Sequence, residues 1–389
     1  MKRVVLKVND FAFGGDGTAV MPGGKICFLP GTVPGDTVSV EIVQDKKNFA
    51  RGRVTAFVEK SGKRIDSFCP HRNDPVPCPG CVYGEVSYET ELETKQKQLE
   101  FFLRQFAVPV IHPPFPSPKR TGYRNKISLS CENGVAGYRA ADNSTLVPVT
   151  TCPLARKAIT DRMITFLPSP AADRVTYRWT LTDGVFVLEH PELFPPDVEH
   201  LTEQIGQHGR FHVPVNSFFQ VNMPVAEELA NRVLSFLKAF EPEHLVELYC
   251  GSGIFSILAA EQLTALRTTG VELDPGAIKA AQKNAADHKT SARCKFTCGD
   301  AAQFKTDRNM NPEKIVLLTD PPRTGMSKEV IERILKLGPK RILYISCAPD
   351  KLRRDLQLLS ARYKVAESAL LDMFPCTAHF ESLTLLEKL

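Results

Sequence analysis

The chain has 389 residues, of which 43% are hydrophobic and 24% are charged, an ordinary composition for a globular protein. At about 150 residues per domain, this length predicts two or three domains that can each bury a core. The net charge of +5, from 49 basic and 44 acidic residues, permits nucleic-acid binding without requiring it.

Two features predict a cytoplasmic protein. No apolar run reaches the ~20 residues of a membrane span, which excludes an integral membrane protein. The N-terminal segment 1–11 is too short and too polar for a secretory signal. Without such a signal, the eleven cysteines indicate a reducing compartment, where clustered thiols are more often metal ligands or nucleophiles than disulfides.

Residues 1–57 predict a small OB-like β-barrel. Turns rich in Gly and Pro separate five short β-segments: Val4–Val8, Gly17–Val20, Lys25–Phe28, Asp36–Val43 and Ala50–Phe57. Basic residues gather near the last turn, at Lys46, Lys47, Arg51 and Arg53. Such barrels often bind RNA or DNA through the charged backbone of the nucleic acid. On charge alone, a solvated basic surface explains these residues equally well.

Residues 58–210 predict a central, β-rich domain. After a loop rich in Pro and Cys, helical spacing of apolar residues predicts a helix over Tyr88–Phe106 that could pack on the next domain. The five prolines between 109 and 118 predict a stiff linker. Four strands and one helix follow: strands Lys126–Cys131, Gly134–Tyr138, Val175–Thr182 and Val185–Glu189, and helix Pro153–Leu167.

Residues 211–389 alternate between helices and strands. The predicted strands are His244–Tyr249, Thr268–Val271, Lys295–Cys298, Lys314–Thr319 and Arg341–Ser346, with a last strand-like Ser382–Leu386. The predicted helices are Val225–Leu237, Ile254–Gln262, Pro275–His288 and Lys328–Leu337. This alternation predicts an α/β fold with a doubly wound, Rossmann-like, mostly parallel sheet, whose ligands bind at the carboxyl ends of the strands.

A glycine-rich turn follows the first strand of this sheet. Gly251 lies in a Gly-x-Gly turn at a helix start, where the missing side chains let a ligand approach the backbone. Glu272 ends the next strand, where a carboxylate can accept both ribose hydroxyls. Asp300 follows the third strand, a place for a group that reads an adenine edge. Because Ser256 replaces the third Gly of a dinucleotide turn, S-adenosylmethionine is favoured over NAD, and a ligand-free sheet is the alternative.

Three further residues predict chemistry at the same edge. Asp320 begins a Pro-Pro turn after a strand and should face the ligand crevice, although such a loop can be only a turn. Cys347 ends the following strand; a cysteine on an apolar strand is usually a small core residue, but its position at the strand end argues for a reactive group. Glu381 supplies a second carboxylate near the C-terminus.

Five segments in order carry a family resemblance. They are SFFQVN at 217–222, LYCGSG at 248–253, DPPR at 320–323, YISCAP at 344–349 and DMFPCTAHFE at 372–381. Together they resemble the signatures of S-adenosylmethionine-dependent RNA uracil-C5-methyltransferases. Because that family also carries an N-terminal TRAM barrel and a four-cysteine iron–sulfur site, the resemblance covers essentially the whole chain.

The resemblance implies that Cys347 is the nucleophile and Glu381 the general base. It also implies contacts to cofactor or target from Gln220, Tyr249, Glu272 and Asp320. In this chemistry a thiolate adds to uracil C6, C5 accepts the methyl group, and a base removes the C5 proton. Since free cysteine has a pKa of about 8.5, we expect the site to lower it. Arg323 could hold an RNA phosphate or a uracil oxygen, or be a surface arginine.

Four cysteines form a second candidate site. Cys69, Cys78 and Cys81 have the spacing C-x₈-C-x₂-C, and Cys152 follows at a distance. This set resembles the family's [4Fe–4S] pattern, although the first gap is wider than usual. Zinc is the physical alternative because four cysteines suit it well, and unligated thiols are a third possibility. The resemblance implies a structural role for the cluster.

Two other function classes compete with this interpretation. Methylation of an exocyclic amino group uses an aromatic residue where Arg323 stands and needs no thiolate. A non-catalytic RNA-binding or electron-transfer protein would leave Gln220, Asp320, Cys347 and Glu381 without a shared purpose. The expected partner is RNA, with ribosomal RNA slightly favoured over transfer RNA because of the barrel, and the expected state is a monomer.

Overall fold

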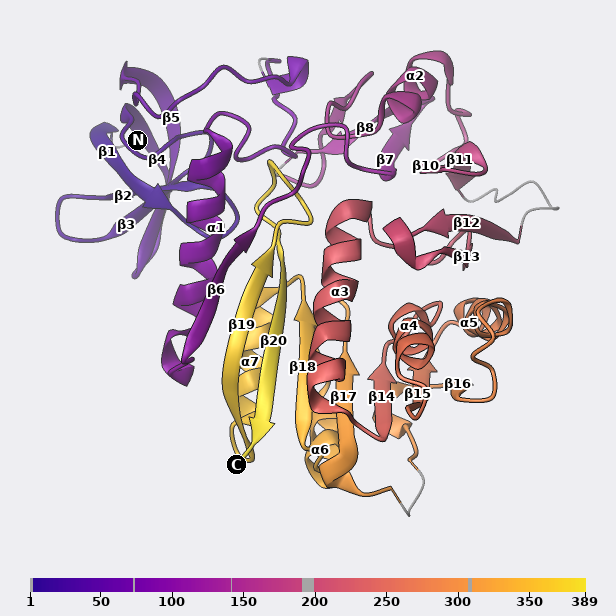
Figure 1. The fold of residues 1–389 in the computed structure, drawn as a ribbon. Coiled ribbons are helices and arrows are strands. Elements are labelled where there is room, and N and C mark those ends of the chain that lie inside the picture. Colours follow the sequence, from indigo (N-terminus) through magenta and orange to yellow (C-terminus); the bar gives the residue numbers. More distant parts are fainter. Residues whose placement is uncertain (1–2, 73, 141, 191–198, 307–309) are drawn as a thin grey trace.

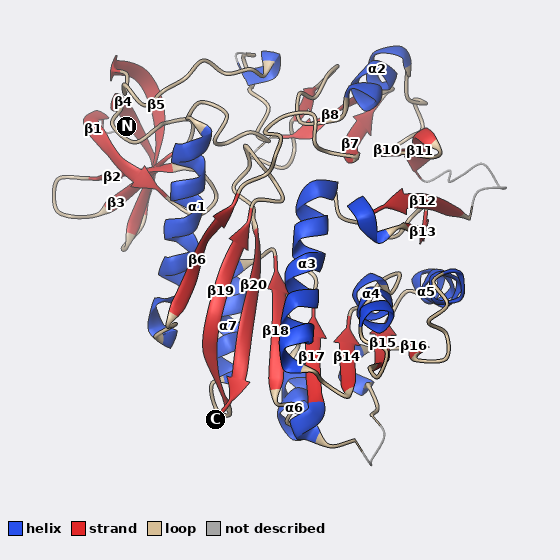
Figure 2. Cartoon of the chain, viewed as in Figure 1, coloured by secondary structure: helices blue, strands red, loops and turns tan. Residues whose placement is uncertain are grey.

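The computed structural model describes the chain except for residues 1–2, 73, 141, 191–198 and 307–309. In chain order it forms an N-terminal barrel, a β-rich central region and a large C-terminal α/β domain (Figures 1 and 2). Within the described residues, no helix has both the length and the apolar character needed to cross a membrane.

The N-terminal strands close into the predicted five-stranded barrel, and their order is β1-β2-β3-β5-β4. The strands are β1 (Arg3–Phe11), β2 (Gly17–Val20), β3 (Ile26–Leu29), β4 (Thr37–Asp45) and β5 (Phe49–Glu59). Alternate side chains such as Leu6, Val8 and Val40 fill the interior. Position 52, inside the barrel, requires glycine, because a Cβ on Gly52 would lie 2.2 Å from Cγ1 of Val40.

The central region contains a five-stranded antiparallel sheet in the order β11-β10-β7-β8-β9. Its elements are β7 (Lys126–Glu132), β8 (Val135–Arg139), β9 (Leu146–Pro148), β10 (Arg174–Thr180), β11 (Gly184–His190) and helix α2 (Lys157–Thr165). A separate hairpin of β12 (His200–Gln204) and β13 (Arg210–Pro214) follows. A fully buried ion pair between Arg178 and Glu203 joins the sheet to this hairpin.

The C-terminal sheet has eight strands in the order β16-β15-β14-β17-β18-β20-β19-β6. They are β6 (Val110–Phe115), β14 (His244–Leu248), β15 (Arg267–Glu272), β16 (Cys294–Cys298), β17 (Ile315–Thr319), β18 (Arg341–Ser346), β19 (Tyr363–Leu371) and β20 (Glu381–Lys388). β14 to β18 are mutually parallel, and β20 runs antiparallel between β18 and β19. This confirms the predicted doubly wound, mostly parallel sheet.

Helices cover both faces of this sheet (Figures 1 and 2). One face carries α3 (Met223–Phe240), α4 (Ile254–Gln262) and α5 (Pro275–Asp287); the other carries α6 (Lys328–Leu337), α7 (Pro349–Leu359) and α1 (Tyr88–Leu103). Successive residues of β14 enter opposite cores, Leu245 on one side and Val246 on the other. This explains why the strand is apolar without alternation, as expected for a parallel strand that is buried on both faces.

The predicted stiff linker after α1 is wrong, because Val110–Phe115 forms β6 at the edge of the C-terminal sheet. An edge strand tolerates prolines since one side of its ladder needs no N–H donor. α1 and β6 therefore contact the C-terminal sheet although both fall within the predicted central range. The domain limits at 57/58 and 210/211 stay predictions.

Candidate active site

Strand register brings the predicted chemical residues to one edge of the sheet. Leu248 pairs with Val271 and with Thr319, so Tyr249, Glu272 and Asp320 all stand at the carboxyl ends of adjacent parallel strands. On the antiparallel side, Ser346 of β18 pairs with Ser382 of β20.

Continuing that antiparallel ladder by one residue puts Cys347 opposite Glu381. The Ser382 hydroxyl donates to the Ser346 carbonyl at 3.2 Å and fixes this register at its end. Two residues 34 positions apart in the printed sequence are thereby neighbours. The roles of nucleophile and base assigned to them stay predictions.

The turn after β14 is held open by backbone conformation and by two glutamates. Tyr249 has a φ of +63° and Gly251 one of +52°, both in the left-handed region that is costly for tyrosine. The Glu272 carboxylate accepts the Gly251 amide at 3.1 Å and the Leu273 amide at 2.8 Å. A Cβ on Gly251 would meet no other atom within 4 Å, so the turn borders open space.

Glu247, which the sequence reasoning did not select, supports the same turn from beneath. Its buried carboxylate accepts the Ser256 amide at 2.9 Å and also pairs with the Ser256 hydroxyl. Burial, opposed by these hydrogen bonds, raises the pKa of Glu247 to about 8. A single charged residue inside an otherwise apolar strand is the signal that could have found it.

A cavity of about 90 Å³ lies above the turn. Gln220, Tyr249, Gly251 and Asp320 all line it, and Phe218, which is 70% exposed, lines it too. The buried Oε1 atom of Gln220 has no hydrogen-bond partner among the described residues. Burial raises the pKa of Asp320 to about 7. The cavity therefore offers a buried oxygen, Oε1 of Gln220, whose hydrogen-bonding capacity the described residues do not use.

Asp300 does not line this cavity; it lines a separate pocket along β15 and β16. It follows β16 and accepts the Ala302 amide at 2.8 Å as the cap of a short turn. Burial raises the pKa of Tyr249 to about 12, with Asp300, Asp355 and Glu272 adding to the effect, which puts Asp300 and Tyr249 within electrostatic reach.

The Cys347 thiol does not have the lowered pKa that we expected. Burial, followed by the neighbouring Glu381 and Asp320 carboxyls, raises its pKa to about 12, and Arg323 opposes the shift. The reason is that two acids and one arginine surround a partly buried sulfur. In the protein without ligands, the thiol is therefore protonated at neutral pH.

Glu381 is buried and stands in the same electrostatic group. Burial and the Asp320 carboxyl raise its pKa well above the usual range, with Arg323 again opposing. Its Oε2 atom has no hydrogen-bond partner among the described residues. When it is ionised, a carboxylate with a raised pKa is a stronger base than an ordinary glutamate, and its free oxygen can accept a proton.

The four predicted ligand cysteines line one small cavity, of about 60 Å³, in the central region. All four are buried, and burial raises the pKa of Cys78 to about 11. Among the described residues, however, no three His, Cys, Asp or Glu side chains are arranged to hold a metal ion together. The structure thus gathers the thiols without forming a single-ion site.

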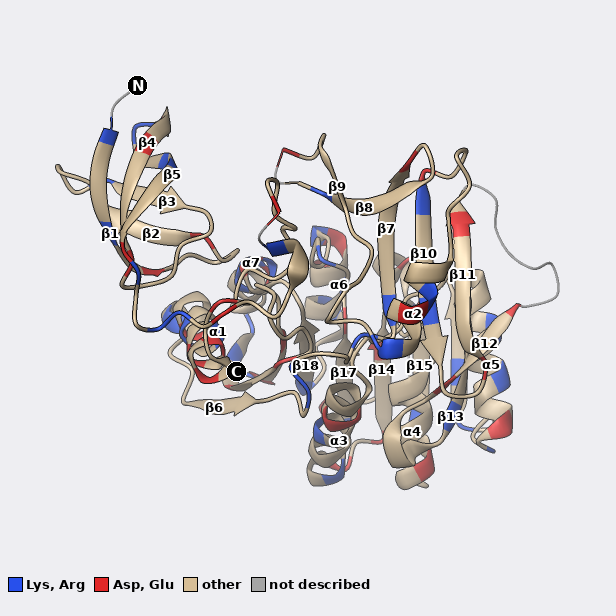
Figure 3. Cartoon of the chain, turned by 90° about the horizontal axis from the view of Figure 1, so that it is seen from above, with Lys and Arg blue, Asp and Glu red and all other residues tan. Residues whose placement is uncertain are grey.

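The basic residues of the barrel are partly neutralised. Arg51 pairs with Asp16 at 3.3 Å, and Arg53 pairs with Glu41. Lys46 and Lys47 are exposed. Figure 3 shows Lys and Arg interspersed with Asp and Glu on this part of the chain, so charge alone does not distinguish an RNA-binding surface from a solvated one.

Two family profiles match the sequence. The one described as tRNA (Uracil-5-)-methyltransferase covers residues 197–389, and the one described as TRAM domain covers residues 2–55. The first range contains the hairpin and every strand of the C-terminal sheet except β6, and the second contains β1 to β4 and most of β5.

Curated relatives align over nearly the whole chain. The 23S rRNA (uracil(1939)-C(5))-methyltransferase RlmD of Edwardsiella ictaluri is 28% identical and covers 99% of this chain and 96% of its own. An uncharacterized RNA methyltransferase of Aquifex aeolicus is 28% identical over 99% of both chains.

A solved structure has the same fold. The tRNA (uracil-54, C5)-methyltransferase of Pyrococcus abyssi, in complex with S-adenosyl-L-homocysteine, superposes with a TM-score of 0.74. The match covers 99% of this chain and 100% of that one at 24% sequence identity.

Proposed function

We propose that this chain, which belongs to the RNA uracil-5-methyltransferase family with an N-terminal TRAM domain, transfers a methyl group from S-adenosylmethionine to carbon 5 of a uridine in RNA. One observation supports the proposal: the β18–β20 ladder ends one residue before Cys347 and Glu381, and the Glu381 carboxyl acts electrostatically on the Cys347 thiol. A thiol nucleophile beside a buried base is what methylation of a pyrimidine carbon requires.

The residues around the glycine turn are suited to bind part of the methyl donor. Gln220, Tyr249 and Gly251, which line the cavity above this turn, would hold it, since Gly251 borders open space and the Gln220 oxygen lacks a partner among the described residues. Glu272 does not line the cavity but accepts the Gly251 amide, and we propose that it also contacts the donor. When bound, S-adenosylmethionine supplies an electrophilic methyl group on a positively charged sulfur. That charge, placed next to the acids of the site, would favour ionised Asp320 and an ionised Cys347 thiol.

Cys347 performs the first covalent step. Its thiol gives up its proton to the neighbouring Asp320 carboxylate, which leaves the Glu381 carboxylate unprotonated for the later step, and the sulfur bonds to uracil C6. The electron pair of the C5–C6 double bond moves toward the C4 oxygen and makes C5 nucleophilic. C5 then forms a bond to the methyl carbon while the bond from that carbon to the sulfonium sulfur breaks, and neutral S-adenosylhomocysteine is the leaving group.

Glu381 completes the reaction. Its carboxylate accepts the proton from the methylated C5, the electron pair of that C–H bond re-forms the C5–C6 double bond, and the Cys347 sulfur leaves as thiolate. A base positioned in this way contributes roughly 10²–10⁴ in rate. Because stacked RNA hides the C6 face, the target uridine must be flipped out or already single-stranded.

The four cysteines are proposed to hold a [4Fe–4S] cluster with a structural role. One cavity is lined by all four thiols, those of Cys69, Cys78, Cys81 and Cys152. Four thiols are the donor set that iron–sulfur clusters use. A tetrahedral zinc ion with Zn–S bonds of about 2.3 Å would require the four sulfurs to lie about 3.8 Å apart. The described residues form no such single-ion arrangement, which favours the larger cluster. Iron and acid-labile sulfide analysis of anaerobically purified protein tests this, with Cys81→Ser expected to lose both and zinc without iron refuting it.

Methyl transfer into RNA tests the proposed function. Labelled S-adenosylmethionine is supplied with unmodified 23S ribosomal RNA and, separately, transfer RNA transcripts, and 5-methyluridine is measured by mass spectrometry. We propose the ribosomal transcript as the better substrate and a monomer as the active state. Cys347→Ala should abolish the product, whereas Cys298→Ala, an exposed cysteine at the same sheet edge, should not. Unchanged methylation by Cys347→Ala would overturn the proposal.

A further inference from the structure

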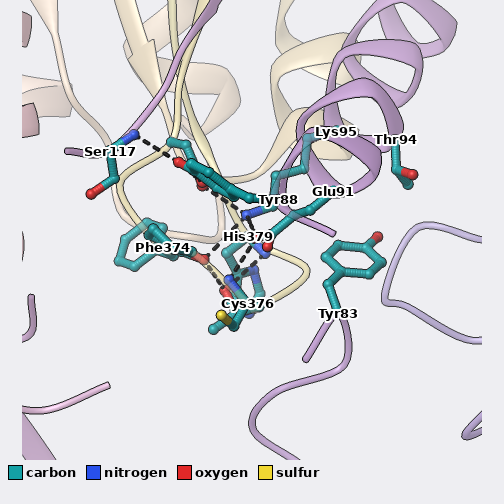
Figure 4. A network of polar contacts seen from close by, with 12 residues as sticks. Tyr83, Tyr88, Glu91, Thr94, Lys95, Ser117, Phe374, Cys376 and His379 are labelled. Atoms are coloured by element: carbon teal, nitrogen blue, oxygen red, sulfur yellow. Dashed lines mark hydrogen bonds and ion pairs between the residues drawn. The ribbon is translucent and has the colours of Figure 1, made fainter. Parts of the chain in front are cut away.

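Lys95, a residue of α1, has no exposed surface, and its side chain reaches the loop that precedes Glu381. The Lys95 ammonium donates to Oε1 of Glu91 and to Oδ1 of Asp372, both at 2.7 Å, and to the Phe374 carbonyl at 3.2 Å. An ammonium group has three hydrogens, so all its donors are used. Figure 4 shows these contacts converging on Lys95 from α1 and from the loop.

Both carboxylates that meet Lys95 are tied to further groups. The Tyr88 hydroxyl donates to Oδ2 of Asp372 at 2.8 Å, and the Cys376 amide donates to Oε1 of Glu91 at 2.6 Å. Arg120 donates to Oε2 of Glu91 at 3.3 Å. Burial would lower the pKa of Lys95, but Asp372 and Glu91 outweigh it and raise the pKa, so the lysine stays charged.

The loop held in this way, residues 372–380, joins the end of β19 to Glu381, the first residue of β20. Its conformation is unusual, since Cys376 has a φ of +68°. Besides the Lys95 contacts, the Asp372 amide donates to the Phe115 carbonyl at 2.9 Å. Three loop carbonyls, those of Met373, Pro375 and Cys376, accept hydrogen bonds from Asn222, the Tyr123 hydroxyl and the Tyr83 amide. The other end of the loop enters the active site.

We propose that Lys95 is a positioning residue, whose ammonium holds loop 372–380 in the shape that sets the Glu381 carboxylate opposite Cys347. The inference rests on the proposed function. Lys95 does not touch the reacting atoms; it acts through the loop backbone. Its loss should therefore impair the step that needs Glu381, removal of the C5 proton, more than the steps that need only Cys347.

The two kinds of step can be separated by the covalent intermediate. When proton removal is slow, the methylated RNA remains bonded to Cys347 through C6, and the complex survives denaturing electrophoresis. Glu381→Gln should accumulate this complex and serves as the reference. Lys95→Met, which keeps the length of the side chain but removes its charge, should also accumulate it and release product at least ten-fold more slowly than the unaltered enzyme.

Two further variants guard against a general loss of structure. Lys95→Met leaves a carboxylate unpaired, so Lys95→Met combined with Asp372→Asn removes that charge, while Glu91 keeps Arg120 and the Cys376 amide. We expect the same accumulation from this pair. The control is Asp36→Asn, which breaks the ion pair between Asp36 of the barrel and Arg64 and should not change the ratio of complex to product.

The rate of complex formation and the rate of its decay are measured on the RNA transcript that the unaltered enzyme methylates. Slower decay in both Lys95 variants, with formation reduced by a smaller factor, supports the inference. If Glu381→Gln traps the complex but the Lys95 variants lose formation and decay equally, or decay normally, Lys95 has no positioning role. If Glu381→Gln traps nothing, the proposed mechanism fails and this role fails with it.

Discussion

Cys347 should be a slow nucleophile in the enzyme without ligands. Burial together with Glu381 and Asp320 raises its thiol pKa to about 12. At pH 8 such a thiol is ionised to about one part in ten thousand, whereas an ordinary cysteine of pKa 8.5 is ionised to about one part in four. Thiolate is the reactive form, so alkylation should be roughly a thousand-fold slower than for an unperturbed thiol.

The assay is alkylation by iodoacetamide between pH 7 and pH 10, followed at the Cys347 peptide by mass spectrometry. The rate should rise about ten-fold per pH unit across this range without a plateau, because the pKa lies above it. Asp320→Asn removes one of the acids that raise the pKa and should accelerate alkylation at pH 8. Arg323→Ala removes the opposing charge and should slow it.

A plateau with a midpoint near pH 8.5 or lower would refute this reasoning. It would mean that the thiol is already activated before any ligand binds, and that the two carboxyls do not act on it. Cys298→Ser is the suitable background, since it removes an exposed cysteine that competes for reagent.

Two further predictions concern the glycine turn. The pKa of Glu247 is raised by burial to about 8, so the folded chain keeps a proton that the unfolded chain loses above about pH 4.5, and stability falls as pH rises between these values. In urea unfolding, Glu247→Gln should lack this loss of unfolding free energy, which reaches about 4 kcal/mol at pH 8; identical pH profiles of stability for the variant and the unaltered protein would contradict it. Gly253→Ala puts a Cβ 2.7 Å from the Phe296 ring at a φ of +79° and should cost about 1–3 kcal/mol of stability. Gly251→Ala meets no atom and should unfold at a higher denaturant concentration than Gly253→Ala, yet still weaken S-adenosylmethionine binding in calorimetry; equal stability of the two variants would refute the packing argument.

The spacing of apolar residues correctly predicted the strands that are apolar and end at clear turns. The barrel strands and the parallel strands of the C-terminal sheet were found because apolar runs end at Gly and Pro turns. β6 was missed because prolines normally oppose strand formation, and only its place at the sheet edge permits them. α7 and β19 were not predicted, although Pro349 stands at the first turn of that helix.

The candidate site divides in the same way. Position at a strand end pointed to Asp320 and Cys347, because parallel topology alone brings strand ends together. The environment of the Cys347 thiol depends on Glu381, which comes from an antiparallel strand late in the chain. This carboxyl helps to raise the thiol pKa, whereas the sequence led us to expect a lowered pKa. Lys95 was out of reach of local reasoning, since its partner Asp372 is 277 positions away and a lysine on a helix is usually exposed.

The most direct test uses RNA in which 5-fluorouridine replaces uridine, so that no C5 proton can be removed. With S-adenosylmethionine present, the account predicts a stable complex of protein, RNA and one methyl group, with the bond mapped to the Cys347 sulfur by tandem mass spectrometry. A complex bonded through any other residue, or methylated RNA that dissociates freely, would show that this sulfur does not carry the reaction.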